Sequence, residues 1–389
     1  MQLGRTIRRI SELGLAMGFV TVMAFAGCGG GKPLSALHAQ MGGSKQGTVP
    51  SLTMAVSTFA GSGAVNASAV AGADDNASGL LATFNAPDGI TTDGTNLYVA
   101  DTNNHKIRKI VIATGAVTTL AGSGTASAVD DVGTLASFNY PRGITTDGTN
   151  LYVADNGNNK IRRIVIATKE VTTFAGSGTA GADDSVSGVA ATFHSPFGIT
   201  TDGTSLYVAD YGNNMIRKID IASRAVSTIA GTGGFGSTDT ASGMPVTFRL
   251  PYGITTDGTN LYVMDHGNNT IRKIVIASGV VTTLAGSAAT APGHADSPIG
   301  TSATFNAPDG VTCDGTNLYV TDTGNNTIRK IVLNSGAVNT LAGSAVLVGG
   351  AVDSTSGLLA TFNGPSGITT DGKSLYVTDM NNNKIRKIQ

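Results

Sequence analysis

Short β-prone runs, separated by turn residues, follow one another along most of this chain. In the stretch that begins at Phe84, apolar and β-branched residues gather in four runs: Gly89 to Thr92, Leu97 to Ala100, Ile107 to Ile112 and Val117 to Ala121. Asp, Gly and Asn residues separate the runs, and these residues favour tight hairpins. The pattern predicts a unit of four antiparallel strands.

The same unit occurs six times along the chain. The copies begin at Phe84, Phe138, Phe193, Phe248, Phe305 and Phe362. Their runs are apolar on both faces, so each small sheet must be covered on both sides, as it is in a ring of stacked sheets. We therefore predict an all-β fold, a six-bladed β-propeller of four-stranded antiparallel blades over residues 55–389. An open solenoid is the structural alternative.

The last copy reaches Gln389 directly after its third run. A matching fourth run precedes the first copy, because "AVSTFAG", Ala55 to Gly61, is similar to "AVTTLAG", Ala116 to Gly122. We expect this N-terminal strand to complete the last blade and to close the ring without a disulfide.

The motif of the unit resembles a known repeat. The stretch "PDGITTDGTNLYVADTNNHKIRKI", Pro87 to Ile110, is similar to the NHL repeat, whose Asn-His pair stands here as Asn104-His105. In the other copies the Asn pair is followed by Lys160, Met215, Thr270, Thr327 or Lys384. Turn geometry, rather than histidine chemistry, is thus the retained feature. The resemblance implies the propeller fold, but the family includes protein-binding, RNA-binding, sensor and enzyme members and does not fix the function.

The first 27 residues have the pattern of a signal peptide. Three arginines, Arg5, Arg8 and Arg9, precede an apolar run from Leu13 to Ala26 that is short for a membrane span. Three fates are open for this segment: cleavage with lipid attachment, which the next residues favour, ordinary secretion, and an uncleaved membrane anchor.

The stretch Phe25-Ala26-Gly27-Cys28 resembles a bacterial lipoprotein box, although Phe25 stands where Leu is usual. The resemblance implies a lipid on Cys28 and export to the bacterial envelope, either periplasmic or at the cell surface. Residues 28–54 are rich in Gly, Ser and Pro and predict a flexible tether. With Cys28 modified, Cys313 has no partner for an intramolecular disulfide.

The charge of the chain gives no reason to expect a nucleic acid as partner. The formal net charge is -1 and the pI is near 6.5. The basic pairs recur once in each copy, so they form no single basic stripe. Asp101 and Arg108 also recur in every copy, which predicts an Asp-Arg pair in each blade.

Positions that differ between the copies mark the candidate binding site. The residue between Pro and Gly at the start of each inner run should line the mouth of the central channel: Asp88, Arg142, Phe197, Tyr252, Asp309 and Ser366. The residue after the repeated Asp forms a second tier: Thr102, Asn156, Tyr211, His266, Thr323 and Met380. We predict that a ligand binds to Asp88, Arg142, Phe197, Tyr252, Asp309, Tyr211 and His266, with His194 and Arg249 nearby.

This mixture of aromatic and charged residues is typical of binding anchors. The sequence therefore favours an exported, lipid-anchored propeller whose loop-bearing face binds an envelope or extracellular protein, a peptide or a glycan, and it assigns no catalytic residue. One alternative is a metal-dependent lyase or lactone hydrolase that uses Asp88, Asp309, His194 and His266. A structural envelope protein without a dedicated site is the other.

No cofactor is predicted, but two patterns leave room for a divalent cation. His194, His266 and His294 stand on neighbouring loops, although no close histidine spacing exists. An Asp also recurs before each copy, at Asp75, Asp184, Asp239, Asp296 and Asp353, with Asp131 displaced in the second. This Asp is expected to cap a short turn, and calcium binding is the alternative.

Overall fold

A computed structural model describes residues 54–62, 69–240, 245–289, 291–344, 346 and 348–389. The predicted signal peptide, Cys28 and all but the last residue of the predicted tether lie outside these residues. Within the described part, no helix has the length and apolar character needed to cross a membrane.

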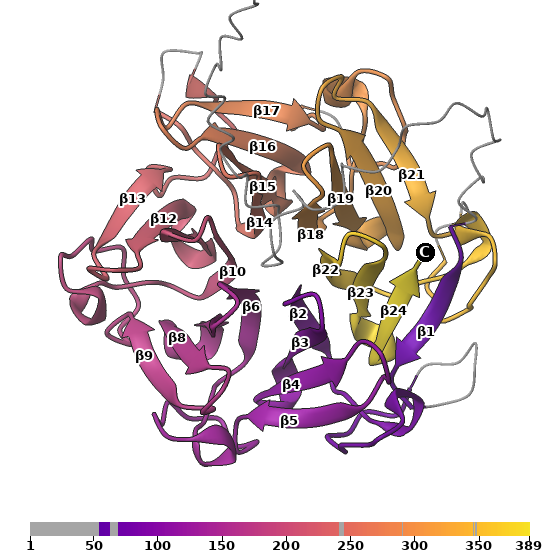
Figure 1. Ribbon diagram of the computed structural model, residues 1–389. Coiled ribbons are helices and arrows are strands. Elements are labelled where there is room, and N and C mark those ends of the chain that lie inside the picture. The colour runs from indigo at the N-terminus through magenta and orange to yellow at the C-terminus, as the bar shows by residue number, and fades with distance from the viewer. Residues whose placement is uncertain (1–53, 63–68, 241–244, 290, 345, 347) are drawn as a thin grey trace, which may run out of the picture.

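Six four-stranded antiparallel sheets surround a central axis, which confirms the predicted propeller for the described residues (Figure 1). The innermost strands are β2 (Pro87–Thr92), β6 (Pro141–Thr146), β10 (Pro196–Thr201), β14 (Pro251–Thr256), β18 (Pro308–Cys313) and β22 (Pro365–Thr370). The second strands are β3 (Asn96–Asp101), β7 (Asn150–Asp155), β11 (Ser205–Asp210), β15 (Asn260–Asp265), β19 (Asn317–Asp322) and β23 (Leu375–Asp379).

The third and fourth strands form the outer half of each blade. The third strands are β4 (Lys106–Val111), β8 (Lys160–Val165), β12 (Met215–Asp220), β16 (Thr270–Val275), β20 (Thr327–Val332) and β24 (Lys384–Ile388). The outermost strands are β5 (Val117–Ala121), β9 (Val171–Ala175), β13 (Val226–Ala230), β17 (Val281–Ala285), β21 (Val338–Ala342) and β1 (Val56–Ala60).

The N-terminal strand completes the last blade, as the sequence predicted. β1 pairs with β24 in antiparallel register, with Val56 opposite Ile388. The backbone N–H of Thr58 donates to the Asp353 carboxylate at 2.9 Å. This closure joins the first and last blades through hydrogen bonds, so the outer edge of β24 is covered.

The hydrophobic cores lie between neighbouring blades. One of them joins Tyr98 and Leu120 of the first blade to Phe138 and Leu151 of the second. Because every blade packs against two others, apolar residues on both faces of each sheet become buried.

Glycines in the innermost strands let these strands approach one another closely. A Cβ atom on Gly198 would lie 2.3 Å from the carbonyl oxygen of Tyr252 in the next blade. Five other glycines meet the next inner strand in the same way: Gly89, Gly143, Gly253, Gly310 and Gly367. No side chain fits at that distance, which explains why this position is Gly in all six copies.

A buried ion pair recurs in every blade, which confirms the predicted Asp-Arg pairing. Arg108 on β4 donates to Asp101 at 2.7 Å, and both side chains are fully buried. The second amino group of Arg108 reaches Asp75 at 2.8 Å, and Asp75 also accepts from the backbone N–H of Thr119. The guanidinium therefore connects the second strand to the loop that enters the blade.

The recurring Asp before each copy thus has a role other than the predicted turn cap. It accepts hydrogen bonds from the third-strand arginine and from a fourth-strand threonine. In the second blade this residue is Asp130, which bonds Arg162 and Thr173, and not the predicted Asp131. The correct counterpart is the residue that reaches the arginine.

The position of His105 was also assigned one residue too late in the other copies. Lys160, Met215, Thr270, Thr327 and Lys384 start the third strands and are the counterparts of Lys106. The counterparts of His105 are Asn159, Asn214, Asn269, Asn326 and Asn383, and all six residues have left-handed backbone conformations. Asn tolerates this conformation better than most residues, so it recurs here.

Candidate functional site

The predicted ligand-binding residues meet at one end of the central channel. Each innermost strand begins at the loop-bearing face with Pro, a variable residue and Gly, so six variable side chains surround the axis. We call the following group the mouth cluster: Asp88, Arg142, Phe197, Tyr211, Tyr252, His266, Asp309 and Ser366. It contains all seven residues that the sequence predicted, together with Ser366 of the predicted ring.

Aromatic side chains pack against one another in a continuous group on one side of the mouth cluster, which we call the stack although Phe197 is tilted against Tyr252 and Tyr211. The ring centroids of Phe197 and Tyr252 are 3.8 Å apart, and that of Tyr211 is 5.1 Å from Phe197. His266 stacks on Tyr252 with centroids 5.4 Å apart, and the Arg142 guanidinium lies 4.9 Å from the Phe197 centroid. The third and fourth blades supply the aromatic rings, and the second blade adds the cation.

The two carboxylates of the mouth cluster are buried and already paired. Arg142 donates to Asp88 at 2.8 Å, and the Ser366 hydroxyl donates to the other Asp88 oxygen at 2.5 Å. The Nδ1 atom of His266 lies 2.7 Å from an Asp309 oxygen. Only 4% of Asp88 and 5% of Asp309 is exposed, so these residues position their neighbours and offer little surface to a ligand.

The electrostatic environment keeps Tyr252 neutral. Burial raises the pKa of the Tyr252 phenol well above its usual value, and the Asp88 and Asp309 carboxylates raise it further. Burial also raises the pKa of Asp309 above its usual range, while the hydrogen bond with His266 lowers it in part. Although burial opposes the charged form of Arg142, the Asp88 carboxylate raises the pKa of Arg142. Tyr252 therefore retains its proton and can donate a hydrogen bond.

Other residues of the predicted second tier connect neighbouring blades. The Thr102 hydroxyl donates to the carbonyl of Pro141 at 2.8 Å, and the Asn156 amide donates to the carbonyl of Pro196 at 3.1 Å. Thr323 donates to Pro365 in the same way. These residues have a structural role at the rim of the channel.

The residues considered for a metal site do not form one cluster, although two of them, His266 and Asp309, contact each other. His194, His294 and Arg249 are exposed, and no described hydrogen bond or ion pair joins their side chains to the mouth cluster. Across the described ranges, no three His, Cys, Asp or Glu side chains are grouped so that they could hold a metal ion.

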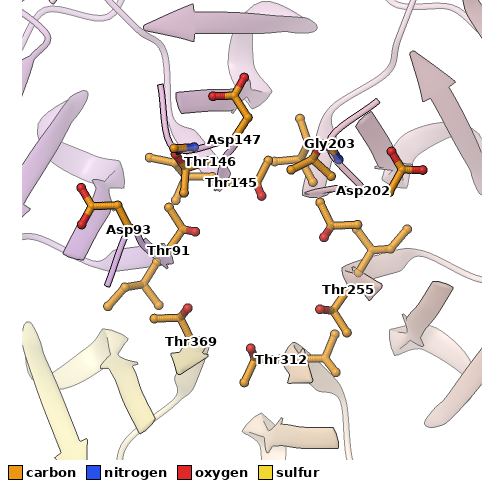
Figure 2. A pocket seen from close by; sticks show the side chains of 18 of the residues that line it. Thr91, Asp93, Thr145, Thr146, Asp147, Asp202, Gly203, Thr255, Thr312 and Thr369 are labelled. Carbon is orange, nitrogen blue, oxygen red and sulfur yellow. Dashed lines mark hydrogen bonds between the residues drawn. The ribbon is translucent and has the colours of Figure 1, made fainter. Parts of the chain in front are cut away.

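A cavity that the sequence did not indicate opens at the opposite end of the channel. It has a volume of about 530 Å³ and lies among the innermost strands and the hairpins that follow them. Five labelled threonines point into it in Figure 2: Thr91, Thr145, Thr255, Thr312 and Thr369. We call this cavity the vestibule.

Sequence comparison between the copies could not single out the vestibule. Its threonines are the same in all six copies, and only positions that differ between the copies were taken as candidates for a site. The signal that could have found them is a hydroxyl retained on an inner strand at a position that faces the axis.

No protein-family model matches the chain. Curated proteins with similar sequences include NHL repeat-containing protein 2 from Homo sapiens, which is 28% identical over 324 residues, 75% of this chain and 44% of the relative. The Gallus gallus protein of the same name is 29% identical over 336 residues, 77% of this chain and 46% of the relative. The chain spans less than half the length of these two relatives.

Solved structures with the same architecture come from Bacteroides species. One from Bacteroides thetaiotaomicron, described as a protein of unknown function, has a TM-score of 0.64 and 23% sequence identity. The match covers 86% of this chain and 75% of the Bacteroides chain. An auxiliary nutrient binding protein from Bacteroides ovatus has a TM-score of 0.63 and 17% identity and covers 86% of this chain and 76% of its own. The six closed blades show that this chain is a β-propeller, and the relatives named for the repeat support an NHL-repeat propeller.

Proposed function

We propose that this chain is an exported, lipid-anchored binding module whose mouth cluster holds a protein, peptide or glycan ligand. The observation that carries the proposal is the contact between Phe197 and Tyr252, whose ring centroids are 3.8 Å apart. Six nearly identical blades create a uniform scaffold, and this stack is where the copies differ most in chemistry. In a chain that served only as a scaffold, we would expect the six copies to carry similar side chains at this position.

The residues of the mouth cluster fall into two groups according to the exposure of their side chains. Arg142 and His266 keep about a quarter of their side chains exposed, at 25% and 27%, and Phe197, Tyr211 and Tyr252 are half-buried. These five residues form the contact surface, since rigid aromatic rings and a guanidinium give much binding energy at low entropic cost. Asp88 and Asp309 hold Arg142 and His266 in place.

The chemistry of this surface favours a ligand with a ring or an apolar side chain next to a hydrogen-bonding group. The rings of Phe197 and Tyr211 offer a stacking face, and Arg142 offers N–H donors beside it. A sugar ring and a peptide with an aromatic side chain both fit this description. Similar propellers from Bacteroides that are described as auxiliary nutrient binding proteins support a general binding role on this architecture.

The proposal is tested by capture from envelope extract and by glycan and peptide arrays, with the purified chain as bait. The test variant is the double substitution Phe197→Ala and Tyr252→Ala. The matched control is Tyr140→Ala, because Tyr140 is an exposed aromatic residue in the loop that leads to β6 and does not belong to the mouth cluster.

We expect the parent and Tyr140→Ala to retain the same ligand and the double variant to lose it. Thermal melting of each variant separates a lost contact from a lost fold. Equal capture by the parent and by a folded double variant would place the ligand elsewhere. No capture by any of them would favour a structural envelope protein.

A further inference from the structure

Six threonine hydroxyls in the vestibule have no described partner in the protein. The residues are Thr91, Thr145, Thr200, Thr255, Thr312 and Thr369, one on each innermost strand, and 5% to 8% of each is exposed. None of these hydroxyls makes a hydrogen bond to another described residue. By contrast, the hydroxyl of the next residue, Thr92, donates to the carbonyl of Asn96 at 2.9 Å, so a neighbouring hydroxyl on the same strand does have a partner in the protein.

Among the described residues, these six oxygens do not belong to the fully enclosed side-chain atoms that lack a partner, so they face the vestibule and are available to water or to a ligand there. Five of the labelled threonines in Figure 2 point toward the axis from different blades: Thr91, Thr145, Thr255, Thr312 and Thr369. A ligand on the axis would therefore meet several hydroxyl oxygens at once, each able to accept a hydrogen bond.

The charges that line the vestibule are negative. Asp93, Asp147 and Asp202 are among its lining residues, and the described lining contains no Lys, Arg or His. Burial alone would raise the pKa of Asp93, but hydrogen bonds from Asn96, Thr95 and Tyr98 lower it below the usual value. The same kinds of bond lower the pKa of Asp147 and of Asp202.

These carboxylates act at a distance. In Figure 2, Asp93, Asp147 and Asp202 lie outside the ring of threonines and point away from the axis. Their negative charge favours a cation in the vestibule without direct contact.

An aliphatic ring lies between the vestibule and the mouth cluster. It consists of Ile90, Ile144, Ile199, Ile254, Val311 and Ile368, which also line a smaller hollow of about 80 Å³ behind the mouth cluster. The vestibule therefore combines hydroxyl groups with apolar walls, and its volume of about 530 Å³ lies in the range of small-molecule sites.

We propose that the vestibule binds an aliphatic ammonium ligand, such as a linear diamine or polyamine. The ammonium group donates hydrogen bonds to the threonine hydroxyls, and the methylene chain contacts the aliphatic ring. A directly coordinated metal ion fits less well, because the described residues offer no group of three carboxylate, imidazole or thiolate ligands.

Calorimetric titration of the full chain with hexamethylenediamine tests the proposal. Hexanediol has the same carbon chain without the charge and is the matched ligand control. The test variant is T91V/T200V/T312V, which removes three hydroxyls at nearly constant volume. The control variant is Thr118→Val, because Thr118 is exposed on the outermost strand β5.

We expect the diamine to bind, the diol to bind at least about tenfold more weakly, and the triple variant to lose at least about tenfold in affinity for the diamine. Thr118→Val should leave the affinity unchanged, since Thr118 does not line the vestibule. Absence of diamine binding, equal binding of the diol, or full affinity in the triple variant would each overturn the proposal. Binding of Mg²⁺ alone with the same dependence on the threonines would overturn the ammonium assignment. If the triple variant does not fold, the single variants T91V, T200V and T312V must each weaken binding.

Discussion

The Nδ1 atom of His105 accepts a hydrogen bond from the backbone N–H of Tyr140, 3.1 Å away, across the boundary between the first two blades. At the other boundaries an Asn side-chain oxygen accepts the equivalent bond; for example, Asn159 accepts from the backbone N–H of Ser195, and Asn214 accepts from that of Leu250. The histidine of the repeat is therefore a substitute for Asn in a ring of bonds between blades. A protonated Nδ1 cannot accept this bond.

Replacing His105 with Asn should remove a pH-dependent part of the stability. Burial lowers the pKa of His105 in the folded protein, so the unfolded chain takes up a proton first as the pH falls. The contribution is present above the unfolded pKa of about 6.5 and is lost as the pH falls below it. Chemical denaturation from about pH 7 to about pH 5 should show a smaller loss of unfolding free energy in His105→Asn than in the parent. Parallel profiles would contradict this role.

Breaking a buried ion pair should be costly. Arg217 lies 2.8 Å from Asp210, and both side chains are fully buried. Arg217→Met leaves the carboxylate buried without its cation, and we expect a loss of about 3–5 kcal/mol in the free energy of unfolding. Guanidinium chloride denaturation measures it, with Lys218→Met on the same strand as control. A loss no larger than that of the control would show that the pair is dispensable.

Adding one methyl group to the inner ring should also destabilise the fold. The new Cβ of Gly198→Ala would lie 2.3 Å from the carbonyl oxygen of Tyr252, which requires the strands to move apart. We expect a cost of about 1–3 kcal/mol or more. At Gly234 the nearest atom, the Thr232 hydroxyl, is 3.8 Å from a new Cβ, so Gly234→Ala should change stability by less than about 0.5 kcal/mol. Equal melting temperatures for the two variants would refute the close-approach explanation.

Closure by the N-terminal strand should protect the ring from association. A chain that starts at Ala69 lacks β1 but keeps Asp75 and its bonds to Arg108 and Thr119. The exposed edge of β24 should lower the melting temperature and promote aggregation, as measured by light scattering. A chain that starts at Met54 is the control, and a peptide of residues 54–62 should restore stability when added. A monomeric, equally stable chain from Ala69 would mean that closure contributes little.

Lipid attachment at Cys28 has a direct test in cells. With Cys28→Ala the thiol that would carry the lipid is absent, so we expect the protein to move from the membrane fraction to the soluble fraction of the envelope. Labelling with a fatty-acid analogue should fail in this variant and succeed in Cys313→Ala. Retention of the Cys28→Ala protein in membranes would favour an uncleaved anchor.

Much of the fold could be predicted because its information is local. Each blade carries its own alternation of apolar runs and turn residues, as at Asp93 and Gly94, and six copies leave little doubt about the ring. The counterparts of His105 were assigned one residue too late, although the equal spacing from Asp101 to Arg108 and from Asp155 to Arg162 already aligns His105 with Asn159. The hydrogen bond to Tyr140 and the left-handed backbone then explain why His or Asn stands at this position.

The sequence by itself determined the blades, the closing strand, the Asp-Arg pair and the variable residues at the channel mouth. Tertiary structure decided that Phe197, Tyr252 and His266 stack, and that Asp88 and Asp309 are buried and paired. It also decided that identical threonines converge on an axis and form the vestibule. The physical reason is that most contacts within a blade join runs close together in the sequence, whereas contacts between blades, such as that of Arg142 with Asp88, 54 positions away, exist only once the blades have packed together.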